Sequence, residues 1–125
     1  QNPDMISNNI FKHYNDNIED AHSKTIYFVE DELTREIGTA ARIKQIYPYK
    51  FRIVTRDEIR EAIIEQNEEI VFLHKVGPEG KKLKARCYKI LIGAADSKFY
   101  YFDYHMINRR KPDGFLKSDL KKLAR

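Results

Sequence analysis

Histidine and cysteine are the side chains best suited to nucleophilic or metal chemistry, and this sequence has few of them. Its 125 residues contain four histidines, His13, His22, His74 and His105, and one cysteine, Cys87. No two histidines have the close spacing of a helical metal site, and a single cysteine excludes both a multi-cysteine zinc site and an intramolecular disulfide. The sequence also has no phosphate-cradling glycine loop and no GxSxG elbow. We therefore expect no catalytic residue, cofactor or metal site, and we favour a chain that is not an enzyme.

His74 and Cys87 come nearest to a nucleophilic pair, because both lie in predicted neighbouring strands. If residues 77–83 form the turn between these strands, His74 lies opposite Arg86 and Leu73 lies opposite Cys87. Side chains alternate between the two faces of a sheet, so His74 and Cys87 then point in opposite directions. We predict an ordinary strand histidine and an inert buried thiol.

Charged and hydroxyl side chains directly follow the first two predicted strands. Glu30 and Asp31 come after the first strand, and Thr55 and Arg56 come after the second. Helical crossovers make the first three strands parallel, so their carboxyl ends meet at the edge where open α/β sheets bind ligands. These four residues are the candidate site of an alternative function, a small-ligand-binding protein or an enzyme. The acidic run itself is better explained as a helix start than as a cation site.

The strands that would position these residues are marked by β-branched and aromatic side chains. Five such segments predict strands: residues 25–29, 51–54, 70–76, 84–92 and 98–107. Apolar residues at helical spacing predict a helix within residues 10–22 and another that begins near Leu33 in a segment closed by Pro48. A further helix begins at Thr55, whose hydroxyl has capping-box spacing to Glu58.

Element order determines the predicted architecture. We expect an α/β fold with a single mixed five-stranded sheet, βαβαβ followed by a β-meander, in the order 2-1-3-4-5. Helices cover both faces, and an amphipathic helix ends the chain. With 42% apolar residues, a chain of this length forms one domain over residues 1–125, in which the polar residues 1–9 are a loose N-terminal segment.

The last two predicted strands are rich in large apolar and aromatic side chains. Strict alternation places them on two faces: Leu91, Tyr100, Phe102 and Tyr104 on one, and Ile90, Ile92, Phe99 and Tyr101 on the other. RNA-recognition motifs also use aromatic residues on strands, but their glycine positions are bulky here and their order of elements differs. We therefore expect core and hairpin packing, and no nucleic acid as a partner.

Basic charge is concentrated at the C-terminus. Residues 109–125 carry a net charge of +5, from seven basic and two acidic residues, whereas the other 108 residues carry −1 of the total of +4. Arg109, Arg110 and Lys111 begin this basic helical tail and are a candidate surface for an anionic partner. The alternative is a helix whose lysines only face water. The leucines of the tail have helical spacing and are expected to dock on the meander: Leu116, Leu120 and Leu123.

The segment from Thr25 to Ile107 resembles a family of α/β domains of the bacterial envelope. The resemblance is carried by the first strand, the strand and capped helix of FRIVTRDEIREAIIEQ, the buried strand at 70–76 and the hairpin with Asp96-Ser97-Lys98 at its turn. The family includes the N-terminal domain of the Tol-system β-propeller protein and domains of curli-secretion and penicillin-binding-protein-activator lipoproteins. The chain also looks like small secreted proteins of Bacteroidetes-type bacteria. The resemblance implies a non-catalytic interaction domain.

We therefore predict an exported protein-interaction module, periplasmic or associated with the cell envelope. The polar start at Gln1 is typical of what signal peptidase leaves behind. The expected partner is another envelope protein or a second copy, bound through a sheet edge or the aromatic meander. No apolar run approaches the roughly 18 residues of a membrane span, so we expect no transmembrane segment.

Overall fold

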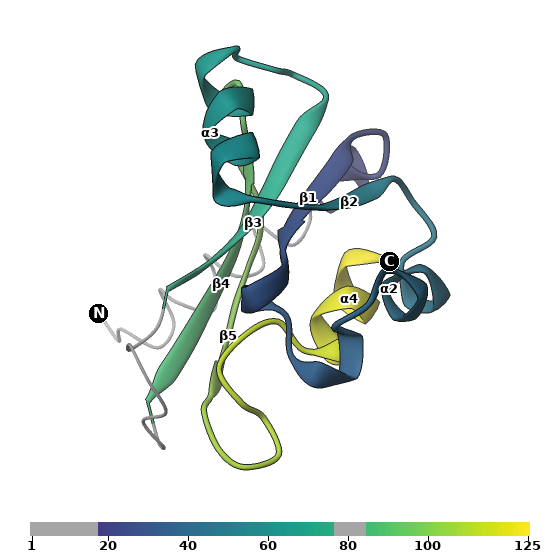
Figure 1. Cartoon of the computed structure of the whole chain (residues 1–125), viewed down its shortest axis with the longest axis vertical. Helices are drawn as coiled ribbons and strands as arrows, with labels where there is room; N and C mark the ends of the chain where they lie inside the picture. Colours follow the sequence, from purple (N-terminus) through teal and green to yellow (C-terminus); the bar gives the residue numbers. More distant parts are fainter. Residues whose placement is uncertain (1–17, 77–84) are drawn as a thin grey trace, which may run out of the picture.

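Residues 18–76 and 85–125 are described in a computed structural model of the chain. Their five strands form one sheet in the order β2-β1-β3-β4-β5, which confirms the predicted topology (Figure 1). β1 is parallel to β2 and β3, whereas β4 is antiparallel to both of its neighbours, β3 and β5. The strand bounds are β1 Thr25–Val29, β2 Phe51–Val54, β3 Ile70–Val76, β4 Arg86–Gly93 and β5 Phe99–Met106.

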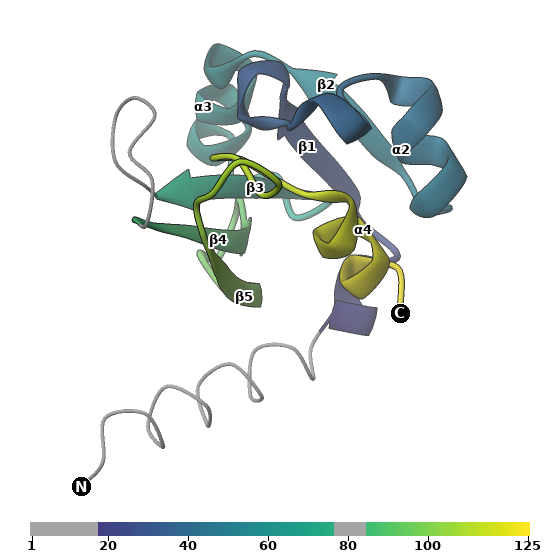
Figure 2. The ribbon, with the colours of Figure 1, turned by 90° about the horizontal axis from the view of Figure 1, so that it is seen from below.

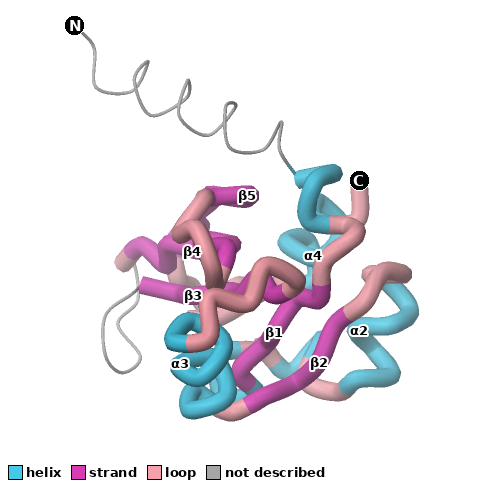
Figure 3. Tube along the Cα trace, turned by 90° about the horizontal axis from the view of Figure 1, so that it is seen from above, coloured by secondary structure: helices cyan, strands magenta, loops and turns pink. Residues whose placement is uncertain are grey.

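Helices cover both faces of this sheet, as predicted. α3 (Arg56–Ile64) lies on one face, and α2 (Ala40–Ile46) and α4 (Lys117–Leu123) lie on the other (Figures 2 and 3). α3 begins where the sequence predicts it, because the Thr55 hydroxyl accepts a hydrogen bond of 3.2 Å from the backbone amide of Glu58. Each face therefore has its own apolar core.

Alternate residues of each strand supply the two cores. Ile26 and Phe28 of β1 join the larger core under α2 and α4, whereas Tyr27 and Val29 join the smaller core under α3. The larger core also contains Leu120 and Leu123 of α4, both almost fully buried. With Leu116, which is also buried, these leucines confirm that the C-terminal helix docks on the sheet.

Only the second half of the helix predicted between Leu33 and Pro48 is confirmed, as α2. Two short 3-10 turns, η2 (Glu30–Glu32) and η3 (Arg35–Ile37), precede α2. The Thr39 hydroxyl accepts a hydrogen bond of 3.2 Å from the Arg42 amide and so starts a new helix after Gly38. Of the helix predicted within residues 10–22, the described residues show only the 3-10 turn η1 (Ile18–Ala21); residues 10–17 and the predicted loose segment 1–9 lie outside them.

A β-bulge overturns the predicted faces of the meander. The register of β4 and β5 shifts between Leu91 and Ile92, so that Leu91 pairs with Tyr101 and Ile90 with Phe102. The extra residue is Tyr100, and both Tyr100 and Tyr101 are consequently buried in the larger core. Strict alternation failed because a bulge inserts one residue into one strand only.

The predicted pairing of β3 with β4 is also wrong, by four residues along β4. His74 lies opposite Ile90 and Leu73 lies opposite Leu91. A turn at residues 77–83 would have placed them opposite Arg86 and Cys87. An even shift leaves the faces unchanged. His74 is therefore exposed on the α3 face of the sheet, whereas Cys87 is fully buried on the other face.

Candidate functional site

The carboxyl edge of the parallel strands brings four of the predicted site residues together. Asp31 follows β1 and Arg56 follows β2, and the two strand ends are adjacent because Val29 pairs with Val54. The Arg56 guanidinium donates two hydrogen bonds to the Asp31 carboxylate, Nη1 to Oδ2 at 3.0 Å and Nη2 to Oδ1 at 2.9 Å. Glu30 and Thr55 line the same shallow, open depression. The sequence therefore predicted this proximity correctly.

Most polar groups of this cluster already have partners. The hydrogen bonds from Arg56 hold the pKa of the Asp31 carboxyl below its usual value. The Thr55 hydroxyl caps α3. Since the side chains of Arg56 and Asp31 are 54% and 68% exposed, solvent screens their attraction, and the pair contributes at most about 1 kcal/mol.

Glu32 is a member of this cluster that the sequence analysis did not single out. It is buried, and its Oε1 atom lies 3.6 Å from Nη2 of Arg56. Its Oε2 atom has no hydrogen-bond partner among the described residues. Burial raises the pKa of the Glu32 carboxyl, against the opposing attraction of Arg56. Three consecutive acidic residues at a strand end do not reveal which of them is buried, so the sequence carries no signal that Glu32 is the buried one.

The chain itself returns to this cluster after β5. After β5 the chain returns across the sheet edge, and Phe115 forms an isolated parallel bridge with Leu33 (Figure 1). The Phe115 amide donates to the Glu32 carbonyl at 2.8 Å. Gly114 has a φ of +131°, and a Cβ there would lie 2.6 Å from the same carbonyl oxygen.

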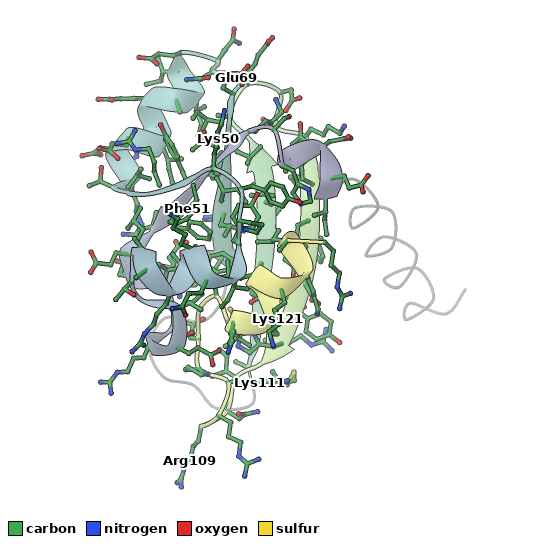
Figure 4. The ribbon with its side chains drawn as sticks, turned by 90° about the vertical axis from the view of Figure 1, so that its right-hand side faces the viewer. Lys50, Phe51, Glu69, Arg109, Lys111 and Lys121 are labelled. Atoms are coloured by element: carbon green, nitrogen blue, oxygen red, sulfur yellow. The ribbon has the colours of Figure 1, made fainter. Side chains whose placement is uncertain are left out.

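Arg109, Arg110 and Lys111 lie apart from the carboxyl-edge cluster. They follow β5, which is at the opposite edge of the sheet from β2 but runs in the same direction, so they lie at the same carboxyl end of the sheet. Asn108 shapes their turn, because its Oδ1 atom accepts hydrogen bonds from the amides of Arg110 and Lys111 at 2.9 and 2.8 Å. All three basic side chains are exposed, and Figure 4 shows Arg109 and Lys111 on a loop that projects from the body. The predicted site residues thus come from two groups of segments at the carboxyl end of the sheet, one after β1 and β2 and the other after β5.

A buried ionic network ties the C-terminal helix to the sheet. Lys89 of β4 and Asp119 of α4 form an ion pair of 2.8 Å, and their side chains are 2% and 1% exposed. The Tyr101 hydroxyl donates to Asp119 at 2.8 Å, and the Leu116 amide donates to the same carboxylate at 2.8 Å. Burial and Asp119 raise the pKa of Tyr101. The sequence offered one indication that Lys89 is buried, because it lies on the same face of its strand as the apolar residues Cys87 and Leu91.

Cys87 and His105 are cross-strand neighbours on the buried face. Burial raises the pKa of the Cys87 thiol to about 11, so the reactive thiolate is scarce at neutral pH. Burial also lowers the pKa of His105. Among residues 18–76 and 85–125, no three His, Cys, Asp or Glu side chains are grouped to hold a metal ion. Nor does any helix in these ranges have the length and apolar character to cross a membrane.

A groove between α2 and α4 is a second concave surface. Six residues line it: Glu36, Arg42, Gln45, Ile46, Lys117 and Lys121. Three of these are cations and one is an anion. Figure 4 shows Lys121 on α4, on the same side of the molecule as Lys50 and Phe51 at the start of β2.

No family model matches the chain, and neither the curated proteins nor the solved structures contain a significant match.

Proposed function

We propose that this chain is a non-catalytic protein-interaction module of the bacterial cell envelope, which binds a partner protein by strand addition to the edge of β2. The observation that carries the proposal is the position of β2. Among the described residues it pairs with β1 on one side and with no strand on the other. An edge strand offers a row of backbone donors and acceptors to another chain.

The register indicates which groups of β2 point outward. The Ile26 amide donates to the Lys50 carbonyl at 3.0 Å. In a parallel ladder alternate residues bond to the same neighbour, so Arg52 and Val54 also face β1. Phe51 and Ile53 therefore direct their amides and carbonyls to the open edge. Their side chains are only partly exposed and pack against the larger core, which holds the edge in place.

The alternative, a ligand site or active site at the carboxyl edge, has less support. The depression there is shallow, Arg56 is held by Asp31, and the return segment after β5 is hydrogen-bonded to the chain that follows β1. The envelope location is supported by the resemblance of the strand–helix–strand segment to envelope domains. It is tested by fractionating cells that produce the tagged full-length gene product.

A proline at position 53 tests the edge directly. Ile53→Pro removes an outward amide and leaves the amides that bond to β1, so we expect the sheet to remain intact. We expect the immobilised variant to lose its capture of envelope proteins. Ile53→Val is the matched control and should retain capture. A circular dichroism spectrum of each variant checks the fold.

Hydrogen exchange gives the second readout. In the free protein we expect the amides of Phe51 and Ile53 to exchange faster than those of Arg52 and Val54, and to become protected when a partner binds. Equal protection of all four amides in the free protein, or capture that survives Ile53→Pro, would refute strand addition at β2.

A further inference from the structure

We propose that the groove between α2 and α4 binds an acidic, extended peptide segment of a partner protein. This surface is separate from the β2 edge, and its use does not depend on strand addition. Its lining combines the cations Arg42, Lys117 and Lys121 with the apolar side chain of Ile46.

The groove has three cations and one acid, Glu36, among the described residues that line it, so it keeps a positive excess. Arg42, Lys117 and Lys121 take part in none of the ion pairs within the part of the chain that the structure describes. Nη1 of Arg42 donates a hydrogen bond of 2.6 Å to the Arg35 carbonyl. Because this acceptor is neutral, it orients the guanidinium without neutralising its positive charge. The one acid of the lining, Glu36, accepts a hydrogen bond of 2.9 Å from the Lys117 backbone amide.

Three other lysines on this side of the sheet are paired. Lys122, one residue along α4 from Lys121, forms an ion pair with Asp103. Lys75 pairs with Asp113 at 2.7 Å, and Lys89 with Asp119 at 2.8 Å. Unlike these three lysines, the cations that line the groove have no ionic partner among the described residues.

The walls of the groove are held in position before any partner arrives. The leucines of α4 are buried in the larger core, and Asp119 joins the helix to Lys89 and Tyr101 of the sheet. α2 is anchored by Ile43, which is fully buried in the same core. Preformed walls reduce the entropy lost on binding.

The spacing of the cations fits an extended acidic segment. Lys117 and Lys121 are four residues apart on one helix, which places their Cβ atoms about 6 Å apart. Side chains on one face of an extended chain repeat every two residues, or about 6.6 Å. Two carboxylates separated by one residue therefore match the two lysines, and the planar guanidinium of Arg42 suits a further carboxylate.

The lining favours a peptide over a single-stranded nucleic acid. Proteins that bind single strands without sequence preference stack bases on aromatic side chains. None of the residues that line the groove is aromatic. Gln45 and Ile46 instead offer an amide and an apolar contact, which suit a peptide backbone and the residue between two acids.

Two triple variants with the same loss of charge test the site. The groove variant is Arg42→Gln/Lys117→Gln/Lys121→Gln, and the control is Arg109→Gln/Arg110→Gln/Lys111→Gln on the projecting loop. The probe is a short fluorescent peptide of alternating Glu and Ser, titrated at low salt and followed by anisotropy. We expect the groove variant to weaken binding about tenfold and the loop variant less than twofold.

Two further probes separate the acidic peptide from other anions. A peptide of alternating Gln and Ser should not bind, and an oligothymidylate of the same length should bind more weakly than the acidic peptide. The proposal is overturned if both triple variants weaken binding equally, if the acidic peptide does not bind, or if the oligothymidylate binds as tightly and is lost in the same variant. Lys121→Glu alone provides a second variant should the triple substitution impair folding.

Discussion

Two carboxylate–cation pairs of nearly equal length lie in very different surroundings. Asp31 and Arg56 meet at 2.9 Å at the carboxyl edge, where their side chains are 68% and 54% exposed. Asp119 and Lys89 meet at 2.8 Å beneath α4, where theirs are 1% and 2% exposed. Solvent screens the first pair, whereas the second has lost its hydration on both sides. Burial, and not contact distance, decides which pair the fold depends on.

The buried pair also makes more hydrogen bonds than the exposed one. The Asp119 carboxylate accepts from the Leu116 amide and from the Tyr101 hydroxyl, so that it starts α4 and joins it to β5. Arg56 and Asp31 join two strand ends that the backbone ladder already holds together. We therefore expect substitutions at the two pairs to differ by several-fold in their effect on stability.

Asp119→Asn should have the largest effect. The amide keeps the shape of the side chain but leaves the Lys89 ammonium without a counter-ion in the core. We expect the free energy of unfolding to fall by about 3–5 kcal/mol. Urea denaturation followed by circular dichroism measures it. A loss below about 1 kcal/mol would mean that the buried pair is no more important than an exposed one.

Adding Lys89→Met to Asp119→Asn should recover about half of that loss. The second substitution removes the uncompensated charge and keeps an unbranched apolar side chain of similar length. The same denaturation experiment compares the single and double variants. If the double variant loses as much stability as Asp119→Asn and Lys89→Met lose together when measured singly, the ion pair is not the reason for the effect of Asp119→Asn.

Arg56→Gln should change stability little. The pair with Asp31 is exposed, and we expect the free energy of unfolding to fall by no more than about 1 kcal/mol, and by less at high salt. Arg60→Gln, which breaks the exposed pair with Asp57 in the same helix, is the matched control. A loss as large as that of Asp119→Asn would make the carboxyl edge a structural centre.

Glu32→Gln should have the smallest effect, with the opposite sign at neutral pH. The raised pKa of the buried carboxyl means that its ionisation disfavours the folded state as pH rises above 4.5, the ordinary value. The variant avoids this cost, so its stability relative to the parent chain should be higher at pH 7 than at pH 4. Thermal melts at both pH values measure the difference. The reverse order would show that Arg56 stabilises the carboxylate more than burial destabilises it.

Much of the architecture was predictable from local signals. Helical crossovers between the first three strands specified the sheet order, and Thr55 with Glu58 located the start of α3. The bulge at Tyr100 was not predictable, because every residue of that strand is compatible with either face. The two 3-10 turns before α2 were missed because Leu33 and Ile37 have helical spacing although the chain between them is not a continuous helix.

The sites show a similar division. Proximity at the carboxyl edge followed from topology, so the cluster of Glu30, Asp31, Thr55 and Arg56 was predicted. The return of the chain across that edge was not, because Gly114 marks a turn without indicating where the chain goes next. The pair of Lys89 with Asp119 joins residues thirty positions apart. Only the tertiary fold brings such residues together.

The most direct test of the proposed function compares the β2 edge with the carboxyl edge in one experiment. Isotope-labelled chain is titrated with envelope extract, and amide chemical shifts are followed by NMR. We expect the largest changes at Phe51 and Ile53, and small ones at Asp31 and Arg56. Changes centred on Asp31 and Arg56, with Phe51 and Ile53 unaffected, would contradict strand addition and favour a ligand site at the carboxyl edge.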